Sequence, residues 1–438
     1  GMLRQTNESA MSSLDTRHFL FLQGPHGPFF RQLGRMLITA GAQVWRVGFN
    51  AGDRAFWPKD QSFIAVTGAP ESWEATLSDL ITEKAITDIV LYGDTRPIHA
   101  TAVAIARARG LTVHVFEEGY LRPYWVTYER GGSNGNSRLM EMGVAEMRAA
   151  LAQSDTDVPR PPAHWGDMRQ HVFYGALYHW FVLFRNHAFS NFRPHRELPV
   201  RTEAALYTRR LVQMPLLALE RTIATARVRF GGFPYHLVLL QLEHDSSLRD
   251  HSPFSRHEDF IDLIVEGFAK GAPGHHHLVF KAHPLENGRS PIRRILRDAA
   301  RKHGVEGRLH YVGGGKLAHL LNEARSAVTV NSTAAQQVLW RGIPLKVFGR
   351  AVFAKPEFVS TQALHEFFAR PDRPDSNAYR DYRQYLLETS QVPGGFYSAR
   401  GRRQLLRQVV DMMLDEADPY EAQRAGRVPP RQNLKVAG

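Results

Sequence analysis

The chain has 438 residues, of which 43% are hydrophobic, and its formal net charge is +12 at pH 7. This length is enough for two α/β domains with sizeable cores and is too long for one compact domain of ordinary size. The absence of cysteine excludes disulfides, thiolate chemistry and a cysteine-rich zinc site. The positive charge attracts nucleic acid, anionic lipids and phosphorylated small molecules alike, but scattered arginines without a zinc finger or an RNP-type strand argue against nucleic acid.

The chain shows no pattern of export or membrane insertion. Its N-terminus lacks the basic, apolar and small-residue segments of a signal peptide, and it contains no run of about 18 uninterrupted apolar residues. We therefore expect a soluble, cytoplasmic protein. Residues 1–17 are expected to be a disordered leader and residues 421–438 a disordered tail.

The first part of the chain alternates short apolar runs with helical patterns. Helices are predicted at Phe29–Ala40 and Ile98–Ala108. Strands separated by helices of this length indicate a parallel sheet with right-handed crossovers. The predicted strands are His18–Gln23, Gln43–Phe49, Phe63–Thr67, Asp88–Tyr92 and Leu111–Phe116.

This alternation stops and then resumes. Residues 18–140 are predicted to be one Rossmann-like domain, residues 141–230 a helical insert rich in aromatics and arginine, and residues 231–370 a second Rossmann-like domain. Residues 371–420 are expected to form C-terminal helices. The predicted fold class is therefore α/β, with two Rossmann-like domains and a helical insert. The predicted strands of the second domain are His236–Leu242, His277–Lys281, Leu309–Val312, Ala327–Val330 and Leu345–Phe348.

The first strand-to-helix junction is a candidate ligand loop. Ligands of doubly wound sheets bind beyond the carboxyl ends of the strands. Gly24 and Gly27 let backbone approach a ligand closely, and the helix that follows His26 has free amides for an anion or a sugar hydroxyl. A tight structural turn is an equally good explanation of this junction.

A later junction of the first domain carries two adjacent acids. Glu117 and Glu118 end a predicted strand and point to opposite faces, so one of them is expected to enter the site as a general acid or base. Arg122 follows as a candidate anion clamp. Solvated charge is the commoner role of such an acidic pair. The Gly- and Asn-rich run Glu129–Ser137 is predicted to be a mobile flap.

Two junctions of the second domain offer a carboxylate and a cationic pair. Asp245 follows a strand, with Gln241 before it and Arg249 after it. Its carboxylate is a candidate nucleophile or electrostatic stabiliser, or it bonds loop amides. Lys281 and His283 alternate at the next strand end, so they share one face and suit a phosphate or carboxylate.

The most persuasive junction joins hydroxyls to a helix start. An apolar strand ends in Asn331, Ser332 and Thr333 and turns directly into a helix of small residues. Hydroxyls and free helix amides together make an anion site suited to nucleotide phosphates. A plain Ser N-cap explains the hydroxyl but not its clustering with the preceding junctions.

No metal or cofactor is expected. Asp155-Thr156-Asp157 has the spacing used by metal-dependent sugar transferases, but it lies in a Ser- and Pro-flanked loop outside either predicted sheet. His275, His276 and His277 enter a strand, where adjacent side chains alternate in direction and do not converge on one ion.

Five segments together resemble a known family. They are LFLQGPHGPFFRQLGRML, VFEEGYLRPYWVTYERGGSNGNS, QLEHDSSLRDHSPF, KAHP and VTVNSTAAQQVLWRGIPLKVFG. In this order they resemble capsular polysaccharide biosynthesis and export proteins of the KpsS type, over roughly Phe19 to Phe358. The resemblance implies a GT-B-like arrangement of the two domains. It also implies a retaining β-Kdo transferase that takes Kdo from CMP-Kdo and places it on a lyso-phosphatidylglycerol primer.

The resemblance also implies how the donor is held. Lys281 and His283 match the family's HP motif, and Ser332 and Thr333 match its phosphate-binding hydroxyls. Gln241 and Asn331 stand beside these residues at the same strand ends, and they are counted with the donor site.

For catalysis the resemblance implies two acidic roles. Asp245 falls where related Kdo transferases have an Asp implicated as nucleophile, and Glu117 or Glu118 falls in their acidic-Gly-aromatic-Leu-Arg motif. The carboxylate of Kdo needs a further donor, for which Arg122 and Arg249 are the candidates.

The implied partners are CMP-Kdo, the lipid primer, the inner face of the inner membrane, and capsule assembly and export proteins, without nucleic acid. Segment Tyr178–Arg201 of the insert is a candidate for lying on an anionic bilayer, with inter-domain packing as its alternative. Two other functions stay open: a nucleotide-sugar epimerase of similar fold, and a non-catalytic scaffold of capsule assembly.

Overall fold

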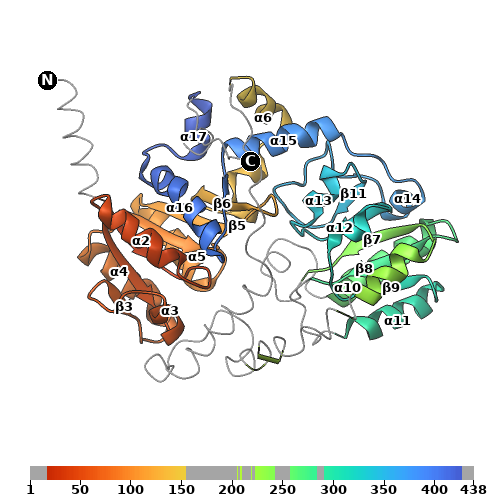
Figure 1. Cartoon of the computed structure of the whole chain (residues 1–438), viewed down its shortest axis with the longest axis horizontal. Helices are drawn as coiled ribbons and strands as arrows, with labels where there is room; N and C mark the ends of the chain where they lie inside the picture. Colours follow the sequence, from red (N-terminus) through yellow and green to blue (C-terminus); the bar gives the residue numbers. More distant parts are fainter. Residues whose placement is uncertain are drawn as a thin grey trace. The chain divides into compact units, whose positions relative to one another are not determined.

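The computed structural model describes residues 17–153, 222–241, 257–283 and 291–426, with the single helical residues 205, 208, 209 and 219. The chain divides into two compact units (Figure 1). One unit comprises Gly1–Arg138, Ala150–Leu211 and Gln384–Gly438, and the other comprises Leu139–Ala149 and Val212–Arg383. Each unit is described below by itself.

The first unit is built on a seven-stranded sheet in the order β12-β6-β5-β4-β1-β2-β3. Strands β1 to β5 are parallel and have the order 3-2-1-4-5 of a Rossmann sheet, while β6 pairs antiparallel with β5 and β12 antiparallel with β6. The strands are β1 (His18–Phe21), β2 (Gln43–Gly48), β3 (Phe63–Ala65), β4 (Asp88–Tyr92), β5 (Thr112–Glu118), β6 (Trp125–Arg130) and β12 (Gln391–Pro393).

Helices cover both faces of this sheet, which buried parallel strands require. On one face, Phe29 and Leu33 of α2 pack with Leu405 and Val409 of α16, because each helix repeats an apolar residue every four positions. On the other face, α4 and α5 enclose a second core. The helices of this unit are α2 (Phe29–Thr39), α3 (Ala51–Ala55), η1 (Pro70–Ser72), α4 (Trp73–Glu83), α5 (Pro97–Arg109), η2 (Asn134–Asn136), α16 (Ala399–Leu414) and α17 (Pro419–Arg424). Most of η3 (Arg138–Glu141) and of α6 (Val144–Leu151) belongs to the second unit.

The run predicted to be a mobile flap is instead a packed part of the first unit. Glu129 and Arg130 end strand β6, and Asn134 begins the short helix η2. The Ser133 amide donates to an Asp94 carboxylate oxygen at 3.0 Å, and the Ser137 hydroxyl donates to Glu129 at 2.7 Å. The flap prediction was wrong, because these polar side chains bond groups inside the fold rather than water.

The second unit repeats the same strand order in a five-stranded, fully parallel sheet, β11-β10-β7-β8-β9. Apolar side chains of α10 pack on β7, β8 and β10. The strands are β7 (Tyr235–Leu239), β8 (His277–Lys281), β9 (Leu309–Val312), β10 (Ala324–Thr329) and β11 (Leu345–Val347). The helices are α10 (His257–Gly271), α11 (Ile292–His303), α12 (Leu317–Leu321), α13 (Ala335–Trp340), α14 (Leu364–Ala369) and α15 (Ser376–Glu388), and residues 222–230 are also helical.

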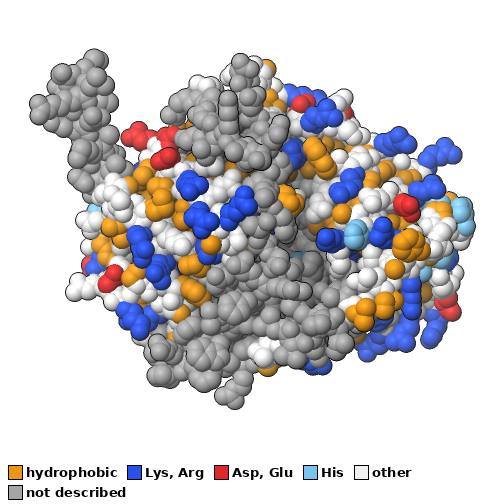
Figure 2. Space-filling view, in the orientation of Figure 1, with side chains coloured by type: hydrophobic (Ala, Val, Ile, Leu, Met, Phe, Trp, Pro, Cys, Tyr) orange, Lys and Arg blue, Asp and Glu red, His pale blue; other side chains and the backbone are white. Residues whose placement is uncertain are grey.

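The parallel strands β1 to β5 of the first sheet and the fully parallel second sheet confirm the predicted α/β class with two Rossmann-like sheets. Lys and Arg side chains are spread over the described surface on the face shown in Figure 2, as the net charge of +12 requires.

Candidate functional site

Three predicted site residues of the second unit meet at one edge of its sheet. Strands β10, β7 and β8 are neighbours, and their carboxyl ends lead to Asn331, Gln241 and Lys281. The crevice between β7 and β10 is the topological switch point, because the chain leaves β7 toward β8 and returns later to β10 on the other side. Ligands of doubly wound sheets bind at such a point.

Two hydrogen bonds between Gln241 and Asn331, here called the Gln241–Asn331 lock, join the ends of β7 and β10 at this crevice. The Gln241 Nε2 donates to Asn331 Oδ1 at 2.7 Å, and the Asn331 backbone amide donates to Gln241 Oε1 at 3.0 Å. Asn331 Nδ2 also donates to the carbonyl of Arg350 at 3.2 Å. Both side chains are buried. The pair therefore ties the residue just beyond β7 to the residue just beyond β10.

The turn from β10 into α13 presents two partly exposed hydroxyl residues at the same edge. The Ser332 hydroxyl accepts from the Ala334 amide at 3.2 Å, and the Ser332 amide donates to Thr329 Oγ1 at 3.3 Å. The Ser332 hydroxyl therefore bonds within the turn that precedes α13. It is not the N-cap of that helix, because the N-cap position is Ala334 and has no side-chain cap. Ser332 and Thr333 are both only partly buried, so their oxygens lie at the rim of the crevice.

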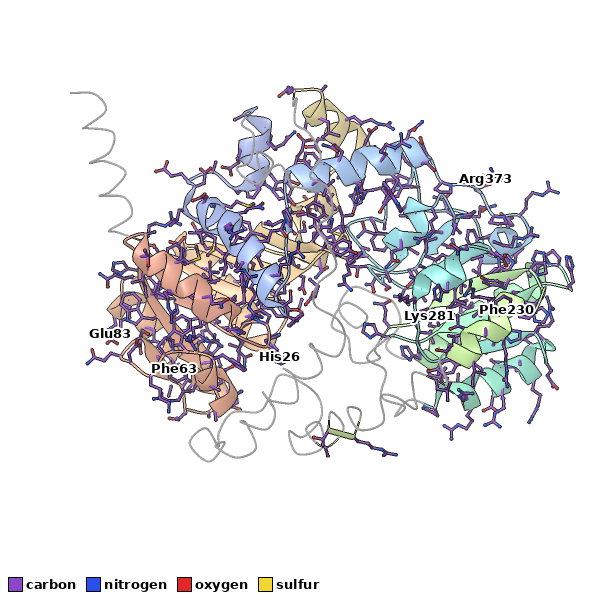
Figure 3. All side chains as sticks on the ribbon, in the orientation of Figure 1. His26, Phe63, Glu83, Phe230, Lys281 and Arg373 are labelled. Atoms are coloured by element: carbon purple, nitrogen blue, oxygen red, sulfur yellow. The ribbon has the colours of Figure 1, made fainter. Side chains whose placement is uncertain are left out.

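Lys281 is the last residue of β8 and is buried, with 5% of its surface exposed (Figure 3). Its ammonium lies 3.4 Å from the carbonyl of Ala282. His283 follows two residues later and is partly exposed. A cation held inside the protein at a strand end retains more of its attraction for an anion than a solvated one, because water screens it less.

Other predicted residues lie outside the described part of the chain. These are the nucleophile candidate Asp245, the anion-clamp candidate Arg249, the pair Asp155 and Asp157 that was not expected to bind metal, and the candidate bilayer segment Tyr178–Arg201. Their roles stay predictions.

In the first unit, the two adjacent acids of β5 have separate partners. The hydroxyls of Tyr92 and Tyr397 both donate to Glu118 Oε1, each at 2.8 Å. Glu117 Oε2 instead accepts from the Asn134 side-chain amide at 3.1 Å. Two phenols therefore anchor Glu118, whereas Glu117 lies beside the η2 turn.

Their surroundings make Glu117 the better acid or base of the two. Burial raises the pKa of Glu117 to about 8, and the neighbouring Glu118 carboxylate adds to this increase. A carboxyl whose pKa lies near the working pH can both give and take a proton. The choice between Glu117 and Glu118 depends on Asn134, Tyr92 and Tyr397, which no local sequence pattern reveals.

The turn that follows these acids requires a glycine. A Cβ on Gly119 would lie 2.2 Å from the carbonyl oxygen of Trp125 and 2.5 Å from that of Leu121. Arg122 folds back so that its Nε donates to the Gly119 carbonyl at 2.9 Å, and the side chain is exposed. The anion-clamp candidate is therefore held at the surface of this turn.

At the first junction, local structure explains the glycines. A Cβ on Gly24 would lie 2.5 Å from the ring of Phe30, and Gly27 has a φ of 104°, which glycine adopts without strain. Partly exposed His26 lies on this loop (Figure 3). These contacts support the structural-turn alternative for the two glycines.

Buried His99 joins this junction to the loop after β4. Sequence patterns did not single out this residue. The His99 Nδ1 donates to the Gly93 carbonyl at 2.7 Å, and its Nε2 accepts from the Gln23 amide at 3.2 Å. Burial lowers the pKa of His99 to about 3, so the ring is neutral in this tautomer. His99 therefore links the two loops at the switch point of the first sheet. Its only signal in the sequence was its place in the first turn of a predicted helix.

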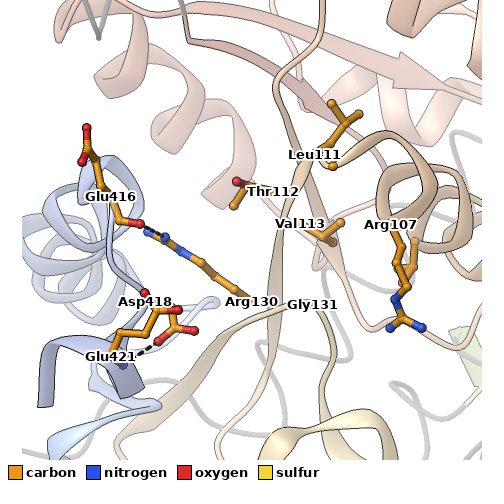
Figure 4. A pocket seen from close by; sticks show the side chains of 11 residues that line it. Arg107, Leu111, Thr112, Val113, Arg130, Gly131, Glu416, Asp418 and Glu421 are labelled. Atoms are coloured by element: carbon orange, nitrogen blue, oxygen red, sulfur yellow. Dashed lines mark hydrogen bonds between the residues drawn. The ribbon is translucent and has the colours of Figure 1, made fainter. Parts of the chain in front are cut away.

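A cavity of about 460 Å³ in the first unit lies away from this edge (Figure 4). It is lined at the amino end of β5 by Thr112 and Val113 and at the end of antiparallel β6 by Arg130. Arg130 donates to the carbonyl of Asp415 at 2.7 Å, and Asp418 caps α17 by accepting from the Glu421 amide. Arg130 and Asp418 of this cavity thus bond the backbone at helix ends, and the cavity is not part of the candidate site.

Within the described residues, no three His, Asp or Glu side chains form a group that could hold a metal ion. The adjacent histidines bond separate partners, since His276 lies 3.0 Å from His236 and His277 lies 2.8 Å from His310. No helix in the described part of the chain is long and apolar enough to cross a bilayer.

Comparison with known proteins places the chain in a family. The sequence model of the family described as "Capsule polysaccharide biosynthesis protein" matches residues 87–397. The chain is 30% identical over 389 residues to the Escherichia coli "Capsule polysaccharide export protein KpsS", covering 88% of this chain and 98% of the relative. It is 31% identical over 387 residues to "Capsule polysaccharide modification protein LipB" of Neisseria meningitidis serogroup A, covering 87% and 92%.

Among solved structures, the chain is similar to the β-Kdo 2,7 transferase KpsC of Thermosulfurimonas dismutans, with a TM-score of 0.39 and 11% identity, over 84% of this chain and 99% of that one. The family match extends from β4 to the residues just before α16, and so includes Glu117, Glu118 and the described site residues of the second unit, but not the first junction at Gly24–Gly27. The chain therefore belongs to the capsule polysaccharide biosynthesis protein family.

Proposed function

We propose that the protein is a glycosyltransferase of capsule assembly, which moves Kdo from CMP-Kdo to a lyso-phosphatidylglycerol primer with retention of configuration. The observation that carries this proposal is the switch point of the second sheet. There, three neighbouring strands bring the Gln241–Asn331 lock, the Lys281 ammonium and the Ser332 turn to one edge. Membership of the capsule family and the KpsS-type motifs support the choice of donor and acceptor.

In this proposal the second unit holds the donor without a metal. CMP leaves Kdo as a phosphate monoester, so negative charge grows on the phosphate in the transition state. Lys281 and His283 supply cationic or donor groups for that charge, and Ser332 and Thr333 supply hydroxyls. Gln241 and Asn331 tie the turn that carries Ser332 and Thr333 to the end of β7.

Retention requires two displacements at the anomeric carbon of Kdo. In the first, the Asp245 carboxylate forms a bond to that carbon as the bond to the CMP phosphate breaks. In the second, an acceptor hydroxyl displaces Asp245, and Glu117 takes the hydroxyl proton. Arg122 or Arg249 pairs with the Kdo carboxylate.

The proposed place of action is the inner face of the inner membrane, where the lipid primer lies. Capsule assembly and export proteins are the proposed partners there. The product, a lipid carrying one Kdo residue, is the primer on which a longer linker is built.

The direct test is mass spectrometry after incubation with CMP-Kdo and a lyso-phosphatidylglycerol analogue. The acceptor is expected to gain the mass of one Kdo residue, and CMP-sialic acid as donor should give no such product. A donor that is converted in the absence of acceptor would instead indicate an epimerase. A protein that turns over neither substrate, and whose Lys281→Met variant fully restores capsule in a deletion strain, would be a scaffold.

A further inference from the structure

The helix at residues 222–230 of the second unit presents an apolar stripe to solvent. Ile223 is 49% exposed and Phe230 79% exposed, and Leu219, which is also helical, is 60% exposed. Spacings of four and seven residues place side chains on the same face of a helix. Phe230 is labelled in Figure 3.

The stripe is not the face by which this helix packs in the unit. Thr225 and Val228 are buried, with 6% and 2% of their surfaces exposed. Thr225 lies against the loop before α12, since a Cβ on Gly315 would be 3.1 Å from its hydroxyl. The helix therefore has a packed side and, on its other side, a stripe of three exposed apolar side chains.

Arginine flanks the stripe, and acidic residues are scarce in the sequence around it. Arg227 and Arg229 are exposed on either side of the stripe, at about 100° of rotation per residue. The Arg229 guanidinium lies 5.5 Å from the centre of the Phe230 ring. From residue 204 to residue 242 the sequence has one acidic residue, Glu220, in a chain with a net charge of +12.

We propose that this stripe, formed by Leu219, Ile223 and Phe230 with Arg227 and Arg229, docks the second unit on an anionic bilayer surface. Apolar side chains flanked by arginine are the pattern of helices that lie in the headgroup region, with rings and alkyl chains inserted and guanidinium groups paired with lipid phosphates. The inference deepens the proposed function, on which it rests for the lipid acceptor. It names the surface that brings the enzyme to that lipid.

A bilayer suits the stripe better than a protein partner does. Stable protein interfaces bury more than about 1,000 Å² in total. Three apolar side chains on one convex helix offer much less than that. A fluid headgroup region adapts to such a narrow stripe and supplies the negative charge that Arg227 and Arg229 require.

The test is co-sedimentation of the full chain with vesicles of phosphatidylcholine alone and of phosphatidylcholine containing phosphatidylglycerol. Ile223→Ser with Phe230→Ser should lower the affinity for the anionic vesicles about tenfold or more. Arg227→Gln with Arg229→Gln should lower it by a similar factor, at about 1 kcal/mol per basic residue near the surface.

Two matched variants control for exposure and for charge. Met36→Ser with Ile38→Ser changes exposed apolar residues of α2, and Arg297→Gln with Arg301→Gln removes two exposed charges from α11. Both should leave vesicle binding within about twofold of the unmodified chain. If the α11 pair loses as much binding as the Arg227 pair, net charge rather than the stripe binds lipid and the proposal is overturned.

Transfer assays separate this inference from the proposed function. With a water-soluble short-chain acceptor, the stripe variants should transfer Kdo at the normal rate, and with a long-chain acceptor in vesicles they should be slower. If the unmodified chain binds vesicles but transfers no Kdo, the proposed function fails alone. Unchanged vesicle binding of the Ile223 and Phe230 variant, together with loss of its assembly with another capsule protein in the absence of lipid, would assign the stripe to a protein partner and overturn the proposal.

Discussion

Burial at the end of β5, together with the neighbouring Glu118 carboxylate, raises the pKa of the Glu117 carboxyl to about 8. A general base must be ionised to accept a proton, so transfer to the acceptor should rise with pH through about 8 and be slow below pH 6. Glu117→Gln should lower kcat about 100-fold or more, with donor binding retained. The measurement is kcat/KM between pH 5 and 9 for the unmodified chain and for this variant.

Glu118→Gln is the matched control for that assignment. It removes the neighbouring negative charge while Tyr92 and Tyr397 keep a side-chain oxygen to which they can donate. The pKa of Glu117 should therefore fall, and the acidic limb of the pH profile should move to lower pH. A limb that stays at the same pH would mean that Glu117 does not produce it.

Lys281 is the second residue whose role can be separated by kinetics. An ammonium that bonds a phosphate contributes about 1.5–3 kcal/mol, so Lys281→Met should raise the KM for CMP-Kdo about 10- to 100-fold. Lys302→Met, on the exposed side of α11, should leave that KM unchanged. Circular dichroism should first show that both variants are folded. An equal KM for the two variants would remove Lys281 from the donor site.

Among the elements, the turn between β5 and β6 has no room for a side chain at Gly119. Gly119→Ala places a methyl group against the backbone carbonyls of Trp125 and Leu121, which cannot move without disturbing β6. We expect a loss of about 1–3 kcal/mol in the free energy of unfolding. Gly143→Ala, whose added Cβ meets no atom within 4 Å, should change it by less than about 0.5 kcal/mol. Urea denaturation measures both, and similar values would show that the turn can relax.

Element prediction succeeded where a strand is a continuous apolar run and failed where distant residues bury polar side chains. Strand β7 is visible in the sequence because Leu237–Leu240 are all apolar, as central parallel strands require. In β6, by contrast, the side chain of Glu129 is buried, and it accepts hydrogen bonds from Ser137 and from Tyr420, which is 291 residues away. Strand β12 is a three-residue strand that contains Pro393, which gives no local strand signal.

The same distinction holds for the candidate site. Alternation of strands and helices was enough to place Gln241, Lys281 and Asn331 at strand ends, and therefore at one sheet edge. The Gln241–Asn331 lock joins residues 90 positions apart, so local pattern could not show it. Nor could local pattern distinguish Glu117 from Glu118, because Tyr397 lies 279 positions from Glu118.

At the scale of the whole molecule, buried histidines contribute to the dependence of stability on pH. Burial lowers the pKa of His99 and His236 to about 3 and that of His114 to about 4. An unfolded histidine titrates near 6.5, so between about pH 6.5 and 4 the unfolded chain binds more protons than the folded one. These three groups therefore stabilise the fold fully above pH 6.5, and that contribution is lost as the pH falls.

Two carboxyl groups have the opposite effect. Burial raises the pKa of Glu129 to about 7 and that of Glu117 to about 8, so the folded chain holds their protons above the pH at which the unfolded chain releases them. Their contribution is present below about pH 4.5 and is lost as the pH rises to 7 and 8. Burial also lowers the pKa of His310 to about 4, so among the described residues four histidines with a pKa of about 3 or 4 stand against two carboxyls and leave a net loss of stability on acidification below pH 6.5.

His236→Gln tests this balance, because the glutamine has no group that titrates in this range. The unmodified His236 should make the chain about 2 kcal/mol less stable at pH 5 than at pH 8, and the variant should lose that part of the difference. His365→Gln is the control, since the His365 side chain is 56% exposed. Urea denaturation at pH 5, 6.5 and 8 gives the free energy of unfolding of each chain. A variant whose stability falls as steeply toward pH 5 as that of the unmodified chain would show that proton uptake at His236 does not drive acid unfolding.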